Sequence, residues 1–455
     1  MEQTTLFDIA VRLLEQKKFS ELKVILAQLN PADIANILEN AEEKSALTLF
    51  RLLPKELAAE TFAYIDSERQ EELINRFSDK EIREVVNELF LDDAVDMIEE
   101  MPANVVARIL KNTDRDTREQ INKLLAYSDD TAGSIMTLEY GYLNKTVTVG
   151  EAFESIRKFG VNKETIYTLY VTERRKLVGV VSLLDILTAD PDTVISEIMD
   201  ENVISVATTE DKEEVAAAFA KYDLLALPVV DSENRLVGIV TVDDAIDVIQ
   251  EETTEDIELM SGISPTDKTY FRTGVLETFL KRVPWLMLMM LSATFTGMII
   301  TGFESKLAAC VILTSFMPML MGTGGNAGSQ SSVTIIRGLS LGDIELGDIL
   351  KAVWKELRVG IICGTALAVV NFGKMLLVDR MLLGNPEVTV AVSAVVSLTL
   401  IVTVLVAKLL GCALPIAAKA IKLDPAVMAS PFITTLVDAV SLVAYFAIAG
   451  AVLGI

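Results

Sequence analysis

Apolar residues follow a helical period over the first part of this chain. Across residues 1–125, Leu, Ile and Val recur three and four positions apart, with breaks at Pro31, Pro54 and Pro102. This spacing is typical of short amphipathic helices. The segments LNPADIANILEN (29–40) and LFLDDAVDMIEEMP (89–102) look like variants of one unit. We therefore expect an all-α superhelical N domain over residues 1–128.

The next part contains an internal repeat with strand-like and helix-like patterns. LVGVVSLLDIL at 177–187 returns as LVGIVTVDDAI at 236–246, and SIM at 134–136 returns as EIM at 197–199. Each copy runs from an amphipathic helix to a β-rich stretch, a turn, a Val-rich strand and a second helix. The repeat predicts two related α/β domains over residues 129–245.

The last part is almost continuously apolar. Five apolar runs occur at 284–303, 307–336, 357–378, 388–415 and 426–453. Each is long enough to cross a bilayer core, which takes about 20 helical residues. Lys and Arg gather before the first run and in the loops after the second and fourth runs. The positive-inside rule then predicts a multi-pass protein of the cell (inner) membrane with a cytoplasmic N-terminus.

Two of these runs contain unusual residues. The second includes PMLMGTGGNAGSQSS at 318–332, whose small residues predict a helix that is broken within the membrane and lines a wet cavity. Close helix packing through small residues is the alternative. The fifth contains Asp438 as its one acid. Intramembrane carboxylates are costly and mark functional sites, although pairing with Lys408 or Lys374 is a structural alternative.

Charge divides the chain into two parts. Residues 1–280 hold 56 Asp or Glu against 28 Lys or Arg, whereas residues 281–455 hold 9 against 12. This acidity argues against a nucleic-acid partner. The chain has no His, which removes imidazole catalysis and imidazole ligands and leaves oxygen ligands suited to hard cations such as Mg²⁺ or Ca²⁺. Its three Cys all lie in apolar stretches and predict no disulfide framework.

The acidity peaks in one predicted helix. Residues 243–260 contain eight carboxylates and no Lys or Arg, and Asp243, Asp247, Glu251 and Glu255 follow one another at a spacing of four. Like charges at this spacing destabilise a helix unless a partner neutralises them. A divalent cation is the partner that we expect, both as ligand and as signal.

The order of these parts resembles the MgtE family of magnesium channels. The resemblance rests on the repeat, which is similar to a pair of CBS domains, on PMLMGTGGNAGSQ (318–330), and on LDPA and PFITTLVD between 423 and 438. It implies an N domain (1–128), tandem CBS domains (129–245), an acidic connecting "plug" helix (246–275) and a five-helix transmembrane domain (276–455). It also implies a homodimer that is not an enzyme and that takes up Mg²⁺ until cytosolic Mg²⁺ closes it.

The resemblance also assigns site residues. It places the pore carboxylate at Asp438 and a second acid at Asp424, with a pore lined by Gly324, Gly325, Asn326, Ser430 and Thr434. Regulatory Mg²⁺ ligands are expected at Asp93 (with Asp92 and Asp96 as neighbouring candidates), Asp211, Glu213, Asp223, Asp244, Asp247, Glu252, Glu255 and Asp256.

Two alternatives stay open. Many CBS pairs bind adenine nucleotides such as ATP, for which Tyr167 and Asp185 are the candidates here. The hydroxyl and carboxylate pairs Ser182/Asp185 and Thr241/Asp244 serve equally well as helix caps. The runner-up function is a CBS-regulated transporter of another divalent cation, such as Co²⁺, Mn²⁺ or Ca²⁺.

Overall fold

The computed structural model describes residues 2–160, 163–266, 270 and 273–454, with only the main chain at 2–8 and 430. The chain divides into two compact units, residues 1–249 and 250–455.

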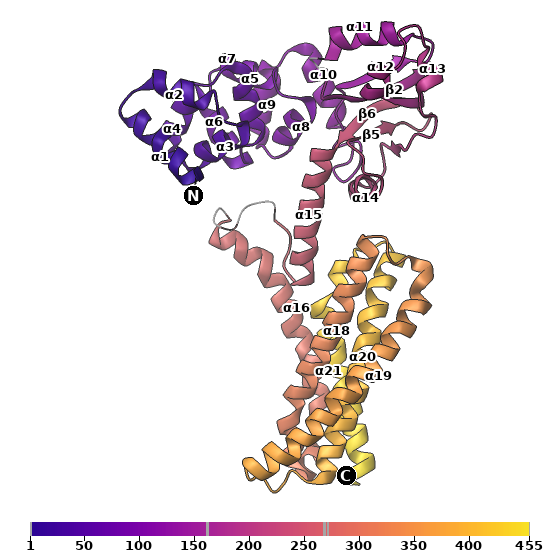
Figure 1. The fold of residues 1–455 in the computed structure, drawn as a ribbon. Helices are drawn as coiled ribbons and strands as arrows, with labels where there is room; N and C mark the ends of the chain where they lie inside the picture. The colour runs from indigo at the N-terminus through magenta and orange to yellow at the C-terminus, as the bar shows by residue number, and fades with distance from the viewer. Residues whose placement is uncertain (1, 161–162, 267–269, 271–272, 455) are drawn as a thin grey trace. The chain divides into compact units, whose positions relative to one another are not determined.

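The first unit begins with short helices that stack in succession (Figure 1). They are α1 (Glu2–Glu15), α2 (Phe19–Leu26), α3 (Pro31–Asn40), α4 (Glu43–Phe50), α5 (Lys55–Ala63), α6 (Ser67–Arg76), α7 (Asp79–Val86), α8 (Leu91–Glu99), α9 (Ala103–Asn112) and α10 (Arg115–Leu124). Their inward faces share one core, in which the rings of Phe50, Phe62 and Phe77 lie 5.1 to 6.1 Å apart. The predicted helical N domain is confirmed.

The repeat forms two three-stranded sheets of matching topology. In each sheet the first strand runs parallel to the second, and the second pairs antiparallel with the third. The first copy contains β1 (Tyr140–Asn144), α11 (Val149–Phe159), β2 (Thr165–Glu173), β3 (Lys176–Ser182) and α12 (Leu183–Thr188). The second contains α13 (Ile195–Ile198), β4 (Val206–Ala207), α14 (Lys212–Tyr222), β5 (Ala226–Val230), β6 (Leu236–Thr241) and the start of α15 (Val242–Met260).

A methionine of each copy packs against a glycine of the other copy. A Cβ at Gly238 in the second copy would lie 2.5 Å from the sulfur of Met136, at the start of the first copy. A Cβ at Gly179 in the first copy would lie 2.6 Å from the sulfur of Met199, near the start of the second. Each copy therefore packs a methionine onto a strand of the other where only glycine leaves room.

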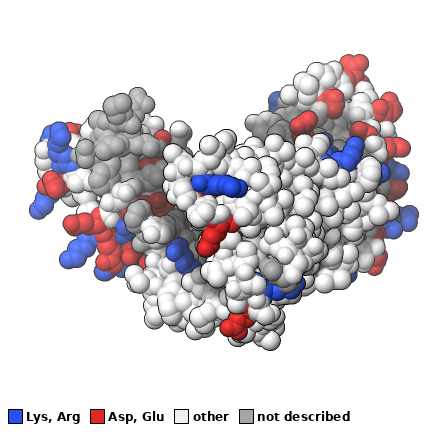
Figure 2. Space-filling model, turned by 90° about the horizontal axis from the view of Figure 1, so that it is seen from below, with Lys and Arg blue, Asp and Glu red and all other residues white. Residues whose placement is uncertain are grey.

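The second unit is a bundle of long helices. Its elements are α16 (Val275–Gly302), α17 (Glu304–Ala309), η2 (Val311–Phe316), α18 (Met317–Ser340), η3 (Leu346–Asp348), α19 (Ile349–Lys374), the π-helical η4 (Met375–Leu382), α20 (Val390–Ala420), η5 (Pro425–Met428) and α21 (Ser430–Leu453). A broad central area of the face seen from below carries few charged side chains (Figure 2). Within the described residues, four segments are long and apolar enough to cross a membrane: 275–302, 346–382, 390–420 and 425–453.

The second predicted run differs from expectation. The region 307–336 forms α17, η2 and α18, and the small and polar residues of α18 keep it outside the set of strongly apolar spans. The prediction of a helix broken at GTGGNAGSQSS is wrong, because α18 is continuous from Met317 to Ser340. Helical hydrogen bonds satisfy the backbone of its glycines. At Gly324, Gly325 and Gly328, atoms of the neighbouring helices α20 and α21 occupy the space that a Cβ would take.

Candidate functional site

Helix α8 and the start of α15 bring their acids together in the first unit. Asp92 is 6% exposed, and its Oδ1 accepts a hydrogen bond from the main chain of Asp93 at 3.0 Å. Asp244 accepts hydrogen bonds from the main-chain nitrogen (3.3 Å) and hydroxyl (2.5 Å) of Thr241. The charge of Asp92 acts on Asp244, and that of Asp244 acts on Asp93. Of the expected regulatory ligands, the fold therefore brings together Asp93 and Asp244 with Asp247 nearby.

Burial and mutual repulsion shift the titration of these acids. Burial, reinforced by the charges of Asp244 and Asp243, raises the pKa of Asp93 to about 7. Burial, reinforced by the charge of Asp93, raises the pKa of Asp92. Burial, reinforced by the charge of Asp92, raises the pKa of Asp244. The pKa of Asp247 is raised by burial and by Asp243. Near neutral pH these groups therefore carry unfavourable negative charge that a cation would relieve.

Two further members, Glu139 and Glu164, were not expected from the sequence. Glu139 precedes β1, and its Oε2 accepts a hydrogen bond from the main-chain N–H of Leu91 at 3.0 Å. Glu164 precedes β2; burial and the charges of Asp92 and Asp93 raise its pKa to about 9. Its buried Oε2 has no hydrogen-bond partner. Neither residue shares a helical spacing with the acids of α8 or α15, so only the fold reveals them.

We call this set the acid cluster; its members are Asp92, Asp93, Asp96, Glu139, Glu164, Asp243, Asp244 and Asp247. The donors are all carboxylate oxygens, which suit Mg²⁺. In the part of the chain that is described, no three such groups converge closely enough to hold one bare ion. Mg²⁺ keeps several of its waters, so the cluster fits a hydrated ion held through water better than a fully dehydrated one.

The next expected ligands belong to α14. Asp211 and Glu213 lie at its start, and Asp223 lies just after its end. Asp211 caps the N-terminus of this helix and accepts a hydrogen bond from the main chain of Glu213 at 2.9 Å. Asp223 follows the C-terminus in a left-handed conformation with φ of 52°. An 11-residue helix separates the two ends by about 16 Å. One chain therefore does not bring these three acids to a single ion.

Glu252, Glu255 and Asp256 lie on the second half of α15, in the second unit. Their role as regulatory Mg²⁺ ligands remains a prediction.

In the second unit, α18 presents one polar face outward. An open groove of about 610 Å³ follows this face. Its described lining residues are Asn326, Ser329, Gln330, Val333 and Thr334. Asn326 and Gln330 are exposed at a spacing of four, in a helix whose opposite face is buried. A polar stripe on a membrane helix requires either water or a polar partner.

The opposite face of α18 packs closely on α20 and α21. A Cβ at Gly324 would lie 2.6 Å from a methyl group of Thr403 and 2.7 Å from one of Val437. A Cβ at Gly325 would lie 2.9 Å from the methyl carbon of Thr434. Gly324 and Gly325 were expected to line a pore with Asn326. Within this chain they form helix contacts, and of the three only Asn326 is among the described lining residues of the groove.

The remaining pore candidates lie on or just before α21. Asp438 directly follows Val437, so it lies next to the contact with Gly324. Lys408 pairs with Glu356 and Lys374 with Asp379, so the structure shows neither lysine pairing with Asp438. Asp424 caps η5 by accepting a hydrogen bond from the main chain of Ala426 at 2.7 Å. The Thr434 hydroxyl donates to the carbonyl oxygen of Pro431 at 3.0 Å. The side chain of Ser430, also expected at the pore, lies outside the described residues.

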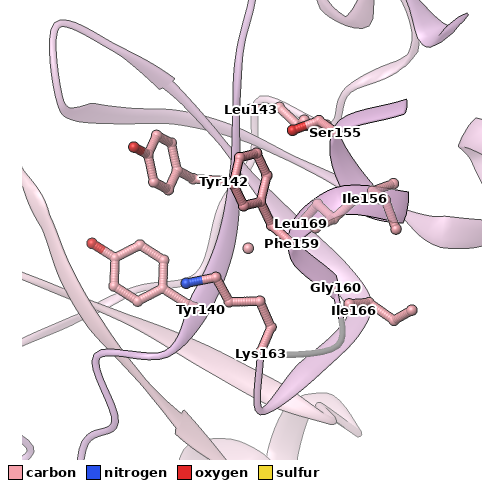
Figure 3. Close-up of a pocket in the computed structure, with 11 residues that line it drawn as sticks. Tyr140, Tyr142, Leu143, Ser155, Ile156, Phe159, Gly160, Lys163, Ile166 and Leu169 are labelled. Carbon is pink, nitrogen blue, oxygen red and sulfur yellow. The ribbon is translucent and has the colours of Figure 1, made fainter. Parts of the chain in front are cut away.

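The nucleotide candidates lie in the first copy of the repeat. Asp185 forms a reciprocal cap with Ser182 at the start of α12, which is the structural role considered for this pair. Tyr167 is 66% exposed on β2. A cavity of about 310 Å³ lies nearby, and neither Tyr167 nor Asp185 is among its described lining residues. Figure 3 shows Tyr140, Tyr142, Phe159 and Lys163 around this cavity, between β1 and the end of α11.

Comparison with known families covers most of the chain. The family model "MgtE: Divalent cation transporter" matches residues 317–448, and the MgtE intracellular N domain matches residues 29–130. CBS domains match residues 132–192 and 195–251. These matches confirm the order of N domain, CBS pair and membrane domain.

Curated relatives and solved structures agree with this assignment. The magnesium transporter MgtE of Thermus thermophilus is 36% identical over 94% of each chain, and that of Bacillus subtilis is 33% identical over 96% of this chain and 95% of its own. A solved soluble part of a magnesium transporter matches with a TM-score of 0.52 and 32% identity, over 55% of this chain and 99% of that one. The cytosolic domain of the Mg²⁺ channel MgtE in complex with ATP matches with a TM-score of 0.50 and 38% identity, over 52% and 99% respectively. The chain therefore belongs to the MgtE family of magnesium transporters.

Proposed function

We propose that this chain forms a homodimeric, Mg²⁺-selective pathway for magnesium uptake across the cell membrane, with its N-terminus in the cytoplasm. The observation that supports transport most directly is the polar face of α18. Asn326 and Gln330 lie outward on a helix whose other faces pack on apolar helices. Two such faces around a two-fold axis would enclose water and provide oxygen ligands for a hydrated cation.

Asp438 would supply the negative charge that faces the cation in this pathway. It lies on α21 beside the contact between α18 and α21, and each subunit of a dimer would contribute one copy. Two carboxylates facing a hydrated divalent ion would balance its charge without stripping its waters. Mg²⁺ sheds water reluctantly, so this arrangement favours outer-shell recognition.

Exposed apolar residues on the CBS helices support self-association. Phe159 of α11, Leu184 and Leu187 of α12, and Tyr222 at the end of α14 are 45 to 67% exposed. Apolar side chains grouped on the helices of a soluble domain are typical of protein interfaces. A second copy of the chain is the partner that we propose.

We further propose that cytosolic Mg²⁺ closes the pathway. The acid cluster joins the N domain, the CBS pair and the start of α15, and its carboxylates repel one another. Bound Mg²⁺ would relieve this repulsion and draw the three parts together, and α15 with Glu252, Glu255 and Asp256 would carry the change toward the membrane unit. ATP at the CBS pair is a second proposed regulator, supported by the ATP complex of a similar cytosolic domain.

Ion flux into liposomes tests the proposal. Purified protein in vesicles that enclose a Mg²⁺-sensitive dye is expected to admit Mg²⁺ and to admit less as Mg²⁺ on the cytosolic side rises. Competing Co²⁺, Mn²⁺ and Ca²⁺ separate this function from its alternative, a transporter of another divalent cation, which the broader family description also supports. Flux that is equal for all four ions would contradict Mg²⁺ selectivity.

A further inference from the structure

Three helices of the second unit meet at a buried polar group that the proposed pathway does not use. The Ser331 hydroxyl on α18 donates to Oε2 of Glu356 on α19 at 2.8 Å and lies 3.1 Å from the carbonyl oxygen of Lys408 on α20. The Lys408 ammonium lies 3.7 Å from the same Oε2. We call Ser331, Glu356 and Lys408 the polar clamp.

The polar clamp is deeply buried. Glu356 is 9% exposed and Lys408 is 6% exposed. Removing two charges from water is expensive, and their attraction only partly offsets that expense. Well-packed apolar side chains would join the three helices at least as stably. Helix association alone therefore does not account for a buried carboxylate and ammonium at this point.

The position of Ser331 on α18 suggests what the polar clamp controls. Ser331 lies five residues after Asn326, which places it about 140° around the helix axis at about 100° per residue. Asn326 and Gln330 occupy the outward polar face, whereas Ser331 belongs to the buried face. A bond at Ser331 therefore fixes the rotation of α18 from behind.

The glycine contacts on this side of α18 are van der Waals contacts. A Cβ at Gly411 of α20 would overlap the carbonyl oxygen of Gly328, so the two helices approach each other closely. Such contacts set the distance between helices, but they have little directional preference. The hydrogen bond from Ser331 to Glu356 is directional, and the pairing with Lys408 holds the carboxylate in place.

We propose that Ser331, Glu356 and Lys408 are positioning residues for ion selection, because the polar clamp fixes the rotation of α18 and thereby the placement of Asn326 and Gln330. This inference rests on the proposed function, since it places the polar face of α18 along the ion path. A rotation of about 15° would move a side-chain atom by roughly 1.5 Å at about 6 Å from the axis. Displacements of this size degrade recognition of Mg²⁺, whose rigid octahedral shell tolerates less variation than that of Ca²⁺.

A variant that removes only one of the two charges is a poor test. Glu356→Gln alone would leave the buried ammonium of Lys408 unpaired and would destabilise the fold. Two other variants avoid this problem. Ser331→Ala keeps the ion pair and removes only the tether to α18. The double variant Glu356→Leu with Lys408→Met removes both charges together and leaves apolar side chains of similar size. Asp379→Asn is the matched control, because it breaks the Lys374–Asp379 pair (3.0 Å) beyond the other end of α19.

The experiment measures Mg²⁺ and Ca²⁺ flux into liposomes, together with the melting temperature of each full-length protein in detergent. We expect Ser331→Ala and the double variant to insert, to melt close to the wild type, and to lower the ratio of Mg²⁺ to Ca²⁺ flux by about tenfold. Asp379→Asn is expected to keep the wild-type ratio.

Two outcomes would overturn the inference. In the first, both variants retain the wild-type ratio of fluxes. In the second, Ser331→Ala retains that ratio while the double variant unfolds, which would make the polar clamp a structural joint. Absence of any divalent flux in the wild type would instead overturn the proposed function, and the inference with it.

Discussion

Oε2 of Glu139 accepts a hydrogen bond from the main-chain N–H of Leu91 at 3.0 Å across 48 residues of sequence. Leu91 begins α8, so the carboxylate of Glu139 lies at a helix N-terminus, where negative charge is favourable. The bond fixes the N domain to the first CBS domain and holds Asp92 and Asp93 within reach of the charge of Asp244. The two domains are thus joined at a point where their own acids repel each other.

The first prediction concerns pH. Unfolded carboxyl groups titrate near pH 4, whereas the pKa of Asp93 in the folded protein is about 7. Between these values the folded state binds more protons than the unfolded state, so stability falls as pH rises. For the fragment 1–275 without Mg²⁺, we expect the free energy of unfolding to be about 2 kcal/mol lower at pH 8 than at pH 5.

Urea unfolding at the two pH values, with and without millimolar Mg²⁺, measures this effect. Mg²⁺ should restore most of the lost stability at pH 8 and add little at pH 5, where protons already neutralise the cluster. Stability that rises from pH 5 to pH 8 in the absence of Mg²⁺ would contradict the assigned repulsion.

The second prediction removes charge from the cluster. Asp93→Asn and Asp244→Asn should each stabilise the Mg²⁺-free fragment at pH 8 by about 1 kcal/mol, since each removes a carboxylate that its neighbours repel. Both should weaken the stabilisation by Mg²⁺. Asp192→Asn is the control, because Asp192 is exposed in a loop outside the cluster. A loss of stability in both cluster variants would contradict this prediction, because it would show that the two carboxylates stabilise the fold even without metal.

The spacing of apolar residues along the sequence was sufficient to predict much of the fold. The helical N domain, the paired α/β domains and the apolar helices all follow from local patterns of apolar residues. The acid-rich helix was also visible, because Asp243, Asp244 and Asp247 are close together in the sequence. Its contact with α8 was not derivable from spacing, since nothing local places Asp93 beside Asp244. Glu139 and Glu164 were missed for the same reason.

The small residues of α18 show a different limit. Glycine lowers helix propensity, and the run from Gly322 to Gly328 therefore predicted a broken helix. Tertiary packing overrides that preference, because Thr403, Val437 and Ile433 occupy the space beside Gly324 and Gly328. The ion pair of Glu356 and Lys408 was equally hidden, since the two residues lie on different helices. Helix propensity depends on the residues of one segment, whereas these contacts depend on the helices that pack against it.

The third prediction tests this packing. Gly411→Ala should destabilise the membrane unit by about 1–3 kcal/mol, because its Cβ would overlap the carbonyl oxygen of Gly328. Gly373→Ala is the matched control: it lies in α19, where a Cβ would meet no atom within 4 Å, so alanine should be neutral or slightly stabilising. Melting temperatures of the full-length protein in detergent provide the comparison. Equal melting temperatures for the two variants would contradict the close approach of α18 and α20.

The fourth prediction concerns the membrane carboxylates. Asp438→Asn should lower Mg²⁺ flux by at least about 100-fold while the protein still inserts, because an isolated carboxylate in a membrane helix costs stability and serves chiefly a cation. Asp424→Asn should have a smaller effect, because Asp424 caps η5 at the start of the last span. Flux into liposomes is the measurement, and retention of selective Mg²⁺ flux by Asp438→Asn would rule out its place in the pathway.

The last prediction concerns the second half of α15. Glu252, Glu255 and Asp256 continue the acidic helix that begins at the cluster, and residues 243–260 contain no Lys or Arg. Neutralising these three together to Gln and Asn should weaken the protection of fragment 1–275 from proteolysis by Mg²⁺ and leave the full-length protein conducting at high cytosolic Mg²⁺. NaCl at matched ionic strength is the control, because monovalent salt screens diffuse repulsion but does not bridge two carboxylates. If NaCl protects the wild-type fragment as well as MgCl₂ does, these acids form a solvated surface and the proposed sensor must lie elsewhere.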